Sequence, residues 1–271
     1  MIIKYHFLFF YQRTLCYNRD IRGGNFMKKT YYKEYSECLN RDMEFIVYGH
    51  TGVPIIVFPA QDGHCQDFEG FGMVDTVADK IDNGQIQLFC VGCIDQENYS
   101  DETGNPAHRS YMLEQYYYYI CDEFVPRVKE INGTGQMLYT TGCSMGGTHA
   151  GNMMLRRPDI FKGCIALSGY YDTDIFFGNY VDEYIYNNSP LKYLNGMSKD
   201  HPYIKMYNER NIILCCGQGA WEDDMVRSAG LMKQTFDRLG VNVWIDFWGY
   251  DVNHDWPWWR IQFPYFINHI L

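Results

Sequence analysis

Short apolar runs alternate with helical stretches along most of this chain, and that alternation restricts the fold more than any other feature. The run at 86–94 (IQLFCVGCI) is almost continuously apolar, as is typical of a strand buried on both faces of a sheet. Further strands are predicted at 43–48, 53–58, 136–141, 164–168, 212–216 and 241–247. Helices are predicted at 68–81, 107–129, 146–156, 225–239 and 262–271. This order predicts an α/β fold with a mostly parallel central sheet flanked by helices.

The stretch between the strands predicted at 164–168 and 212–216 is too long for a plain connection. Residues 170–210 within it are rich in Tyr, Asn, Asp and Gly, and we expect them to form a short cap inserted over a cleft. No break in composition marks a second core, so residues 27–271 are predicted to form a single domain.

Residues 1–26 differ from the rest of the chain. Their apolar part, 7–10, is too short and too interrupted for the core of a signal peptide, and no small-residue cleavage site follows it. Gly23-Gly24 can be encoded by the ribosome-binding sequence GGAGG, and Asn25-Phe26 leaves a short spacer before Met27. We therefore hypothesise that translation begins at Met27 and that residues 1–26 are a non-native or disordered extension. N-terminal sequencing of the native protein tests this, and a first residue of Met1 would refute it.

Composition excludes several classes of protein. Of the 271 residues, 46% are hydrophobic and 21% are charged, which indicates a globular chain. The net charge of −10 repels a phosphate backbone, so we expect no nucleic-acid partner. No apolar run reaches the ~20 residues of a membrane helix, so no membrane partner is expected either. The sequence leaves the oligomeric state open, a homo-oligomer included.

Ten cysteines in a short secreted domain would indicate disulfides, but this chain is neither short nor visibly secreted. Most of them lie inside apolar runs, where a thiol behaves as a small hydrophobic side chain. Cys90 and Cys93 have CxxC spacing, yet no second pair completes a zinc site, and on a strand they would point to opposite faces. A reducing cytoplasm is the expected location.

The most specific motif is Gly142-Cys143-Ser144-Met145-Gly146-Gly147, which has the form G-x-S-x-G. It follows an apolar strand and precedes a helix, as a nucleophile elbow requires. The glycines allow the close backbone approach of a tight strand-to-helix turn. We therefore predict Ser144 as a catalytic nucleophile, with the Met145 N–H at the helix start facing an oxyanion.

A serine hydroxyl needs a general base within hydrogen-bond reach. In hydrolases with this elbow the histidine comes last in the chain, and His254 fits because it lies just beyond the final predicted strand. His269 is a weaker candidate, and His149 is expected to pack in the core. His64 and His50 precede the serine, although His64 is a candidate for lining the cleft.

The orienting acid is expected after the strand at 212–216. The sequence there is GQGAWEDD, which places Glu222, Asp223 and Asp224 at the start of the next helix. One or two acids at that position are ordinary for helix capping and for the helix dipole, which leaves one to spare. Glu222 is the favoured acid and Asp223 the alternative.

Together, the GCSMGG, GQGAWED and VNHDWPWW segments, with FPAQDG after an early strand, resemble the putative esterase family of α/β-hydrolases. That family includes S-formylglutathione hydrolases, feruloyl and acetyl-sugar esterases, and mycolyltransferases. The resemblance covers residues 31–271 and implies an α/β-hydrolase fold with a Ser-acid-His triad. It also implies a second oxyanion donor, the backbone N–H of Asp62, with Gln61 as the alternative.

The predicted function is a serine esterase that forms an acyl-enzyme on a small or aromatic acyl ester, with a sugar ester as one candidate. Trp221, Trp256, Tyr170 and His64 are the candidate substrate contacts; the aromatic residues could equally serve in packing. A thioesterase or acyltransferase with the same triad is the second reading, and a catalytically silent binding module is the third. No cofactor or metal is expected, since the HExxH and GxxxxGK[ST] motifs are absent.

Overall fold

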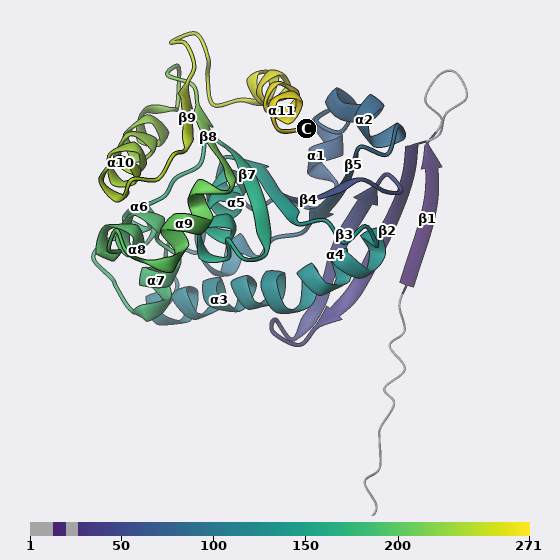
Figure 1. The fold of residues 1–271 in the computed structure, drawn as a ribbon. Helices are drawn as coiled ribbons and strands as arrows, with labels where there is room; N and C mark the ends of the chain where they lie inside the picture. Colours follow the sequence, from purple (N-terminus) through teal and green to yellow (C-terminus); the bar gives the residue numbers. More distant parts are fainter. Residues whose placement is uncertain (1–12, 20–26) are drawn as a thin grey trace, which may run out of the picture.

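A nine-stranded sheet runs through the molecule in the computed structural model, which describes residues 13–19 and 27–271 (Figure 1). The strand order is β1-β2-β3-β5-β4-β6-β7-β8-β9. The strands β1 to β3 pair antiparallel at one edge, and every neighbouring pair from β5 to β9 is parallel. The strands are β1 Arg13–Arg19, β2 Met27–Ser36, β3 Arg41–Tyr48, β4 Val53–Phe58, β5 Ile86–Val91, β6 Leu138–Cys143, β7 Phe161–Leu167, β8 Asn211–Cys216 and β9 Trp244–Phe247. The predicted mostly parallel sheet is confirmed.

Two apolar cores cover the two faces of this sheet. Along β4, Ile56 and Phe58 point into one core, whereas Ile55 and Val57 point into the other. This alternation follows from the two-residue period of a strand, and it explains why the central strands are apolar throughout. Helices α3, α4, α5 and α10 supply side chains to the first core, and α1, α2 and α11 supply them to the second.

The helices that surround the sheet match the predictions except at one place. The segment predicted as one helix at 68–81 is wrong: it consists of α1, a turn at Gly72 with φ +76°, a 3₁₀ turn at Asp75–Val77, and α2. The helix predicted at 107–129 contains α3, a π-helical turn at Tyr119–Phe124, and α4. The helices are α1 Asp67–Gly70, α2 Ala78–Asp82, α3 Pro106–Tyr118, α4 Val125–Asn132, α5 Met145–Arg156, α6 Asp174–Phe177, α7 Glu183–Asn187, α8 Pro190–Gly196, α9 Pro202–Asn208, α10 Asp223–Leu239 and α11 Trp256–Ile270.

The insertion predicted at 170–210 lies between β7 and β8 and contains the four short helices α6 to α9. Hydrogen bonds fasten it to α3: the Arg109 guanidinium donates to the Phe176 carbonyl at 2.9 Å, and the Ser110 hydroxyl donates to Asp182 at 2.5 Å. A small apolar cluster joins Phe177 of the insertion to Met145, the residue after Ser144. The insertion is therefore packed directly against the start of α5.

The parallel strands place the candidate residues at one edge of the sheet. Asp62 follows β4, Ser144 follows β6, Glu222 follows β8 and His254 follows β9. Because the carboxyl ends of parallel strands meet at the same edge, residues far apart in the sequence converge there.

The remaining expectations from the sequence concern the N-terminal segment, membrane helices and the cysteines. The hypothesis about residues 1–26 falls mostly outside the described residues, and of that segment only Arg13–Arg19 is described, as β1. Among described residues, no helix has the length and apolar character to cross a membrane. The nine cysteines from Cys38 to Cys216, whose side chains the structure describes, are unpaired thiols.

Candidate active site

The turn that carries Ser144 is strained and tightly packed. Ser144 has φ 57° and ψ −123°, a conformation that residues with a side chain rarely adopt, and its N–H donates to the Leu167 carbonyl at 2.9 Å. A Cβ on Gly146 would lie 2.4 Å from the Phe58 carbonyl oxygen, and one on Gly142 would lie 2.4 Å from the backbone of Gly146. The glycines of the motif therefore let α5 begin directly against β4, which fixes the serine at the sheet edge.

The loop that carries His254 is fastened to the loop that carries the acids. The Gly219 N–H donates to the Val252 carbonyl at 2.9 Å, and the His254 N–H donates to the Ala220 carbonyl at 3.0 Å. The Asn253 side chain accepts a further bond from the Ala220 N–H at 2.8 Å. These bonds bring the loops after β8 and β9 together, so the acid and the imidazole approach the serine as one unit.

Three of the predicted residues meet at this point. His254 Nε2 lies 2.8 Å from Ser144 Oγ, and His254 Nδ1 lies 3.5 Å from Glu222 Oε1. The first distance is a hydrogen bond, and the second is longer than one but within range of a direct charge interaction. Glu222 is 1% exposed, whereas Asp223 is exposed in the first turn of α10. The structure therefore places Glu222, and not Asp223, beside the imidazole.

The other histidines lie away from Ser144 or face other partners. His149 is buried and its Nε2 lies 2.9 Å from Asp95 Oδ1, so it packs in the core as predicted. His269 bonds the Tyr265 carbonyl near the end of α11. His50 and His64 are exposed. In the described part of the chain, no group of three or more His, Cys, Asp and Glu side chains is placed to hold a metal ion.

The loop after β4 reaches the start of α5. Asp62 has φ 57°, and its side chain lines a hollow of about 140 Å³ together with His64, Cys93 and Asp95. Ser144 does not line that hollow. The Gln61 side chain is exposed and donates to Ser100 Oγ at 2.9 Å. Asp62 therefore lies in the loop after β4, and its Oδ1 is buried without a hydrogen-bond partner among the described residues.

Comparison with known proteins agrees with this geometry. A family model described as "Putative esterase" matches residues 36–269. The chain belongs to this family. The resemblance indicated by the sequence motifs is confirmed, and family membership supports a hydrolase that acts on carboxylic esters. No curated protein matches the sequence.

Solved structures share the fold at low sequence identity. A ferulic acid esterase is 19% identical with a TM-score of 0.68, and the match covers 90% of this chain and 97% of that one. An S-formylglutathione hydrolase from Agrobacterium tumefaciens is 14% identical with a TM-score of 0.67, covering 93% and 96%. An S-formylglutathione hydrolase from Staphylococcus aureus is 13% identical with a TM-score of 0.66, covering 90% and 98%. These matches confirm the α/β-hydrolase fold.

The candidate substrate contacts differ in how they are presented. The Trp221 ring is 85% exposed, next to Glu222, on a residue with φ 67°. Trp256 is half-buried and stacks on Phe71, with ring centroids 4.1 Å apart. Tyr170 is buried and its hydroxyl accepts a hydrogen bond from Arg227; burial raises the pKa of this phenol, and Arg227 opposes the shift. Trp221 is thus the most accessible of these three rings.

Two residues beside Glu222 were not recognised from the sequence. Ser168 Oγ lies 2.6 Å from Glu222 Oε1, and Trp259 Nε1 lies 3.0 Å from Ser168 Oγ. A usable signal existed, because Ser168 directly follows β7 at the same sheet edge as the predicted residues.

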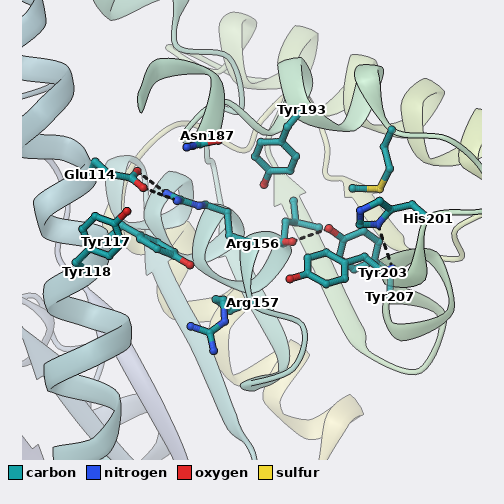
Figure 2. A pocket seen from close by; sticks show the side chains of 12 residues that line it. Glu114, Tyr117, Tyr118, Arg156, Arg157, Asn187, Tyr193, His201, Tyr203 and Tyr207 are labelled. Atoms are coloured by element: carbon teal, nitrogen blue, oxygen red, sulfur yellow. Dashed lines mark hydrogen bonds and ion pairs between the residues drawn. The ribbon is translucent and has the colours of Figure 1, made fainter. Parts of the chain in front are cut away.

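A larger cavity of about 420 Å³ lies at the other end of α5 (Figure 2). Arg156 crosses this cavity and forms two hydrogen bonds to the Glu114 carboxylate, at 2.8 and 2.9 Å, with the Tyr117 ring 3.3 Å away. Ser144 directly precedes α5 and Arg156 ends it, so this cavity is separate from the candidate active site.

Proposed function

We propose that this chain is a serine esterase in which Ser144 is the nucleophile, His254 the general base and Glu222 the acid that orients it. The single observation that carries the proposal is the 2.8 Å contact between His254 Nε2 and Ser144 Oγ, made across 110 positions of sequence. Membership of the esterase family supports the same reaction class.

The reaction takes place in two halves. Ser144 Oγ attacks the ester carbonyl carbon while His254 Nε2 accepts the hydroxyl proton. The carbon–oxygen bond to the alcohol then breaks, the alcohol leaves with the proton from His254, and the acyl group remains on the serine. Water repeats the sequence on the acyl-enzyme and releases the acid. Glu222 stabilises the imidazolium that forms in each half.

The oxyanion is proposed to be held by two backbone N–H groups, those of Met145 and Asp62. Met145 is the first residue of α5, where N–H groups lack helical partners and the helix dipole favours negative charge. The tight contact between Gly146 and the carbonyl groups of Phe58 and Pro59 keeps the start of α5 close to the strand that leads to Asp62. Loss of one such donor typically costs ~10² to 10³ in rate.

The proposed substrate is a small or aromatic acyl ester, with an ester of a sugar as one candidate. The exposed Trp221 ring beside Glu222 supports an aromatic or sugar ring as part of it. A thioesterase or acyltransferase activity uses the same three residues. Rates on p-nitrophenyl acetate, a feruloyl ester and S-formylglutathione distinguish these possibilities.

A fluorophosphonate probe tests the proposal directly, because it reacts only with an activated serine. We expect one labelled peptide that contains Ser144, and no labelling of the Ser144→Ala variant. Labelling of another residue, or activity that persists without Ser144, would overturn the assignment.

A further inference from the structure

We propose that Ser168 and Trp259 are positioning residues that hold the Glu222 carboxylate for the imidazole. They form a chain of hydrogen bonds from Trp259 Nε1 to Ser168 Oγ, at 3.0 Å, and from Ser168 Oγ to Glu222 Oε1, at 2.6 Å. The three side chains come from α11, the end of β7 and the start of α10, and all are at most 3% exposed. This inference rests on the proposed function and deepens it.

The chemistry of the three groups allows only one direction of donation along these hydrogen bonds. An indole N–H can only donate, so Ser168 Oγ must accept from Trp259. The single proton of the Ser168 hydroxyl then remains for Glu222, which accepts as a carboxylate. Trp259 therefore fixes the rotation of the hydroxyl, and the hydroxyl fixes one oxygen of the acid.

The backbone at Ser168 supports a role for its side chain. Ser168 has φ 51°, a region that favours glycine, and its N–H donates to the Cys215 carbonyl at 2.6 Å. A residue with a side chain in this conformation is strained, and such strain is concentrated at functional sites.

The surroundings of Glu222 make this bond important. Glu222 Oε2 is buried and has no hydrogen-bond partner, and the imidazole lies 3.5 Å from Oε1, beyond hydrogen-bond distance. Three further titratable groups, Tyr171, Cys215 and Cys216, lie near enough to feel the charge of Glu222. Burial raises the pKa of all three, so they stay neutral at pH 7, and neither a phenol nor a thiol can supply a positive charge to balance the acid.

Trp259 also contacts the base. Its ring meets the His254 ring edge to face, with centroids 4.9 Å apart and an interplanar angle of 85°. One side chain thus supports both the acid, through Ser168, and the plane of the imidazole.

The test uses the full chain and p-nitrophenyl acetate. We expect Ser168→Ala and Ser168→Gly each to lower kcat by about 10- to 100-fold, as loss of a hydrogen bond to a charged group predicts, while KM changes little. The Gly variant also relieves the positive φ, so it separates the loss of the hydroxyl from backbone strain.

A double-mutant cycle tests whether Trp259 acts through Ser168. Trp259→Phe keeps most of the ring but removes the N–H, and we expect it to lower kcat in the native background and to have little further effect in Ser168→Ala. Ser110→Ala is the matched control, because Ser110 is also fully buried and donates to a carboxylate, that of Asp182. Ser110→Ala should lower the melting temperature by about as much as Ser168→Ala does, and it should leave kcat unchanged.

The outcomes separate this inference from the proposed function. Unchanged kcat in both Ser168 variants, or fully additive effects in the cycle, would overturn the positioning role while an inactive Ser144→Ala still supports the esterase. Activity that survives Ser144→Ala would instead remove the proposed function.

Discussion

The Glu222 carboxylate lies 3.5 Å from His254 Nδ1, whereas Asp223, the next residue along the chain, faces solvent in the first turn of α10. We therefore predict that Glu222→Gln lowers kcat by about 10³- to 10⁴-fold, because the imidazole loses the charge that orients it. Asp223→Asn is the control and should change kcat little. Steady-state kinetics on p-nitrophenyl acetate measures both variants. The reverse ranking would assign the acid to Asp223.

The contact between α5 and β4 leaves no room for a side chain at Gly146. Gly146→Ala should destabilise the protein by about 1–3 kcal/mol, because its Cβ would lie 2.4 Å from the Phe58 carbonyl oxygen. It should also displace Ser144 and abolish labelling by a fluorophosphonate. Gly230→Ala in α10 meets no atom within 4 Å, so it should stabilise the protein by about 0.5–1 kcal/mol. Urea unfolding compares the two, and equal stabilities would contradict the packing argument.

The contribution of Asp62 to catalysis is predicted to come from its backbone. Asp62→Gly keeps the backbone N–H, and glycine readily adopts the φ of 57°. We therefore expect kcat to change little, without the ~10²- to 10³-fold loss that follows removal of an oxyanion donor. The stability should hold or rise, since glycine removes the backbone strain. A loss of kcat beyond 100-fold in Asp62→Gly, with the fold intact by circular dichroism, would assign the catalytic role to the carboxylate instead.

The exposed ring of Trp221 is predicted to bind the ring of an aromatic ester. Trp221→Ala should raise KM for a feruloyl ester by roughly fivefold, the loss of about 1 kcal/mol of ring stacking, and leave KM for p-nitrophenyl acetate little changed. Tyr35→Ala is the control, because Tyr35 is also exposed but lies on β2 at the other side of the sheet. Equal effects on both esters would contradict a specific contact with the acyl ring.

Buried thiols should make the protein unstable in alkali. Burial raises the pKa of Cys164 and of Cys216 to about 12, above the ordinary value of about 8.5. The contribution of these thiols to the free energy of unfolding is fully present below about pH 8.5. It falls as the pH rises toward 12, because the thiols of the unfolded chain lose their protons at lower pH than those of the folded chain. Each such thiol costs about 1.4 kcal/mol per pH unit in that range.

Urea unfolding from pH 7.5 to 10 under reducing conditions measures this dependence. Cys164→Ala lowers the free energy of unfolding at every pH, because it leaves a cavity. The slope of that free energy against pH should be shallower than in the native protein, since one titrating thiol is missing. An unchanged slope would mean that Cys164 does not titrate in the unfolded chain as assumed.

Strands buried on both faces were predictable, because an apolar run can be recognised in the sequence without knowing which elements pack against it. The runs at 53–58 and 212–216 became β4 and β8 with almost the same bounds. The strand β2 was not predicted, since Met27–Ser36 mixes charged and aromatic residues and contains no apolar run. The single helix expected at 68–81 was wrong because Gly72 takes a positive φ and ends α1.

The residues of the site were predictable where they lie in a recognisable sequence motif. The glycines around Ser144 identify the elbow, and the chain order points to His254. The choice between Glu222 and Asp223 depends on which side chain turns inward, and a helix start allows either. The place of Ser168 directly after β7 puts it at the sheet edge, but only tertiary hydrogen bonds join it to Glu222 and Trp259, and no sequence pattern indicates those bonds.

The backbone bonds between Gly219 and Val252 and between Ala220 and His254 have a consequence for engineering. The segments that carry Glu222 and His254 bond to each other through their backbones, so a change in the length of either one would leave backbone N–H and C=O groups of the other without partners. A graft that widens the substrate range must therefore transplant both segments together. Exchange of either one alone should yield a folded but inactive chimera.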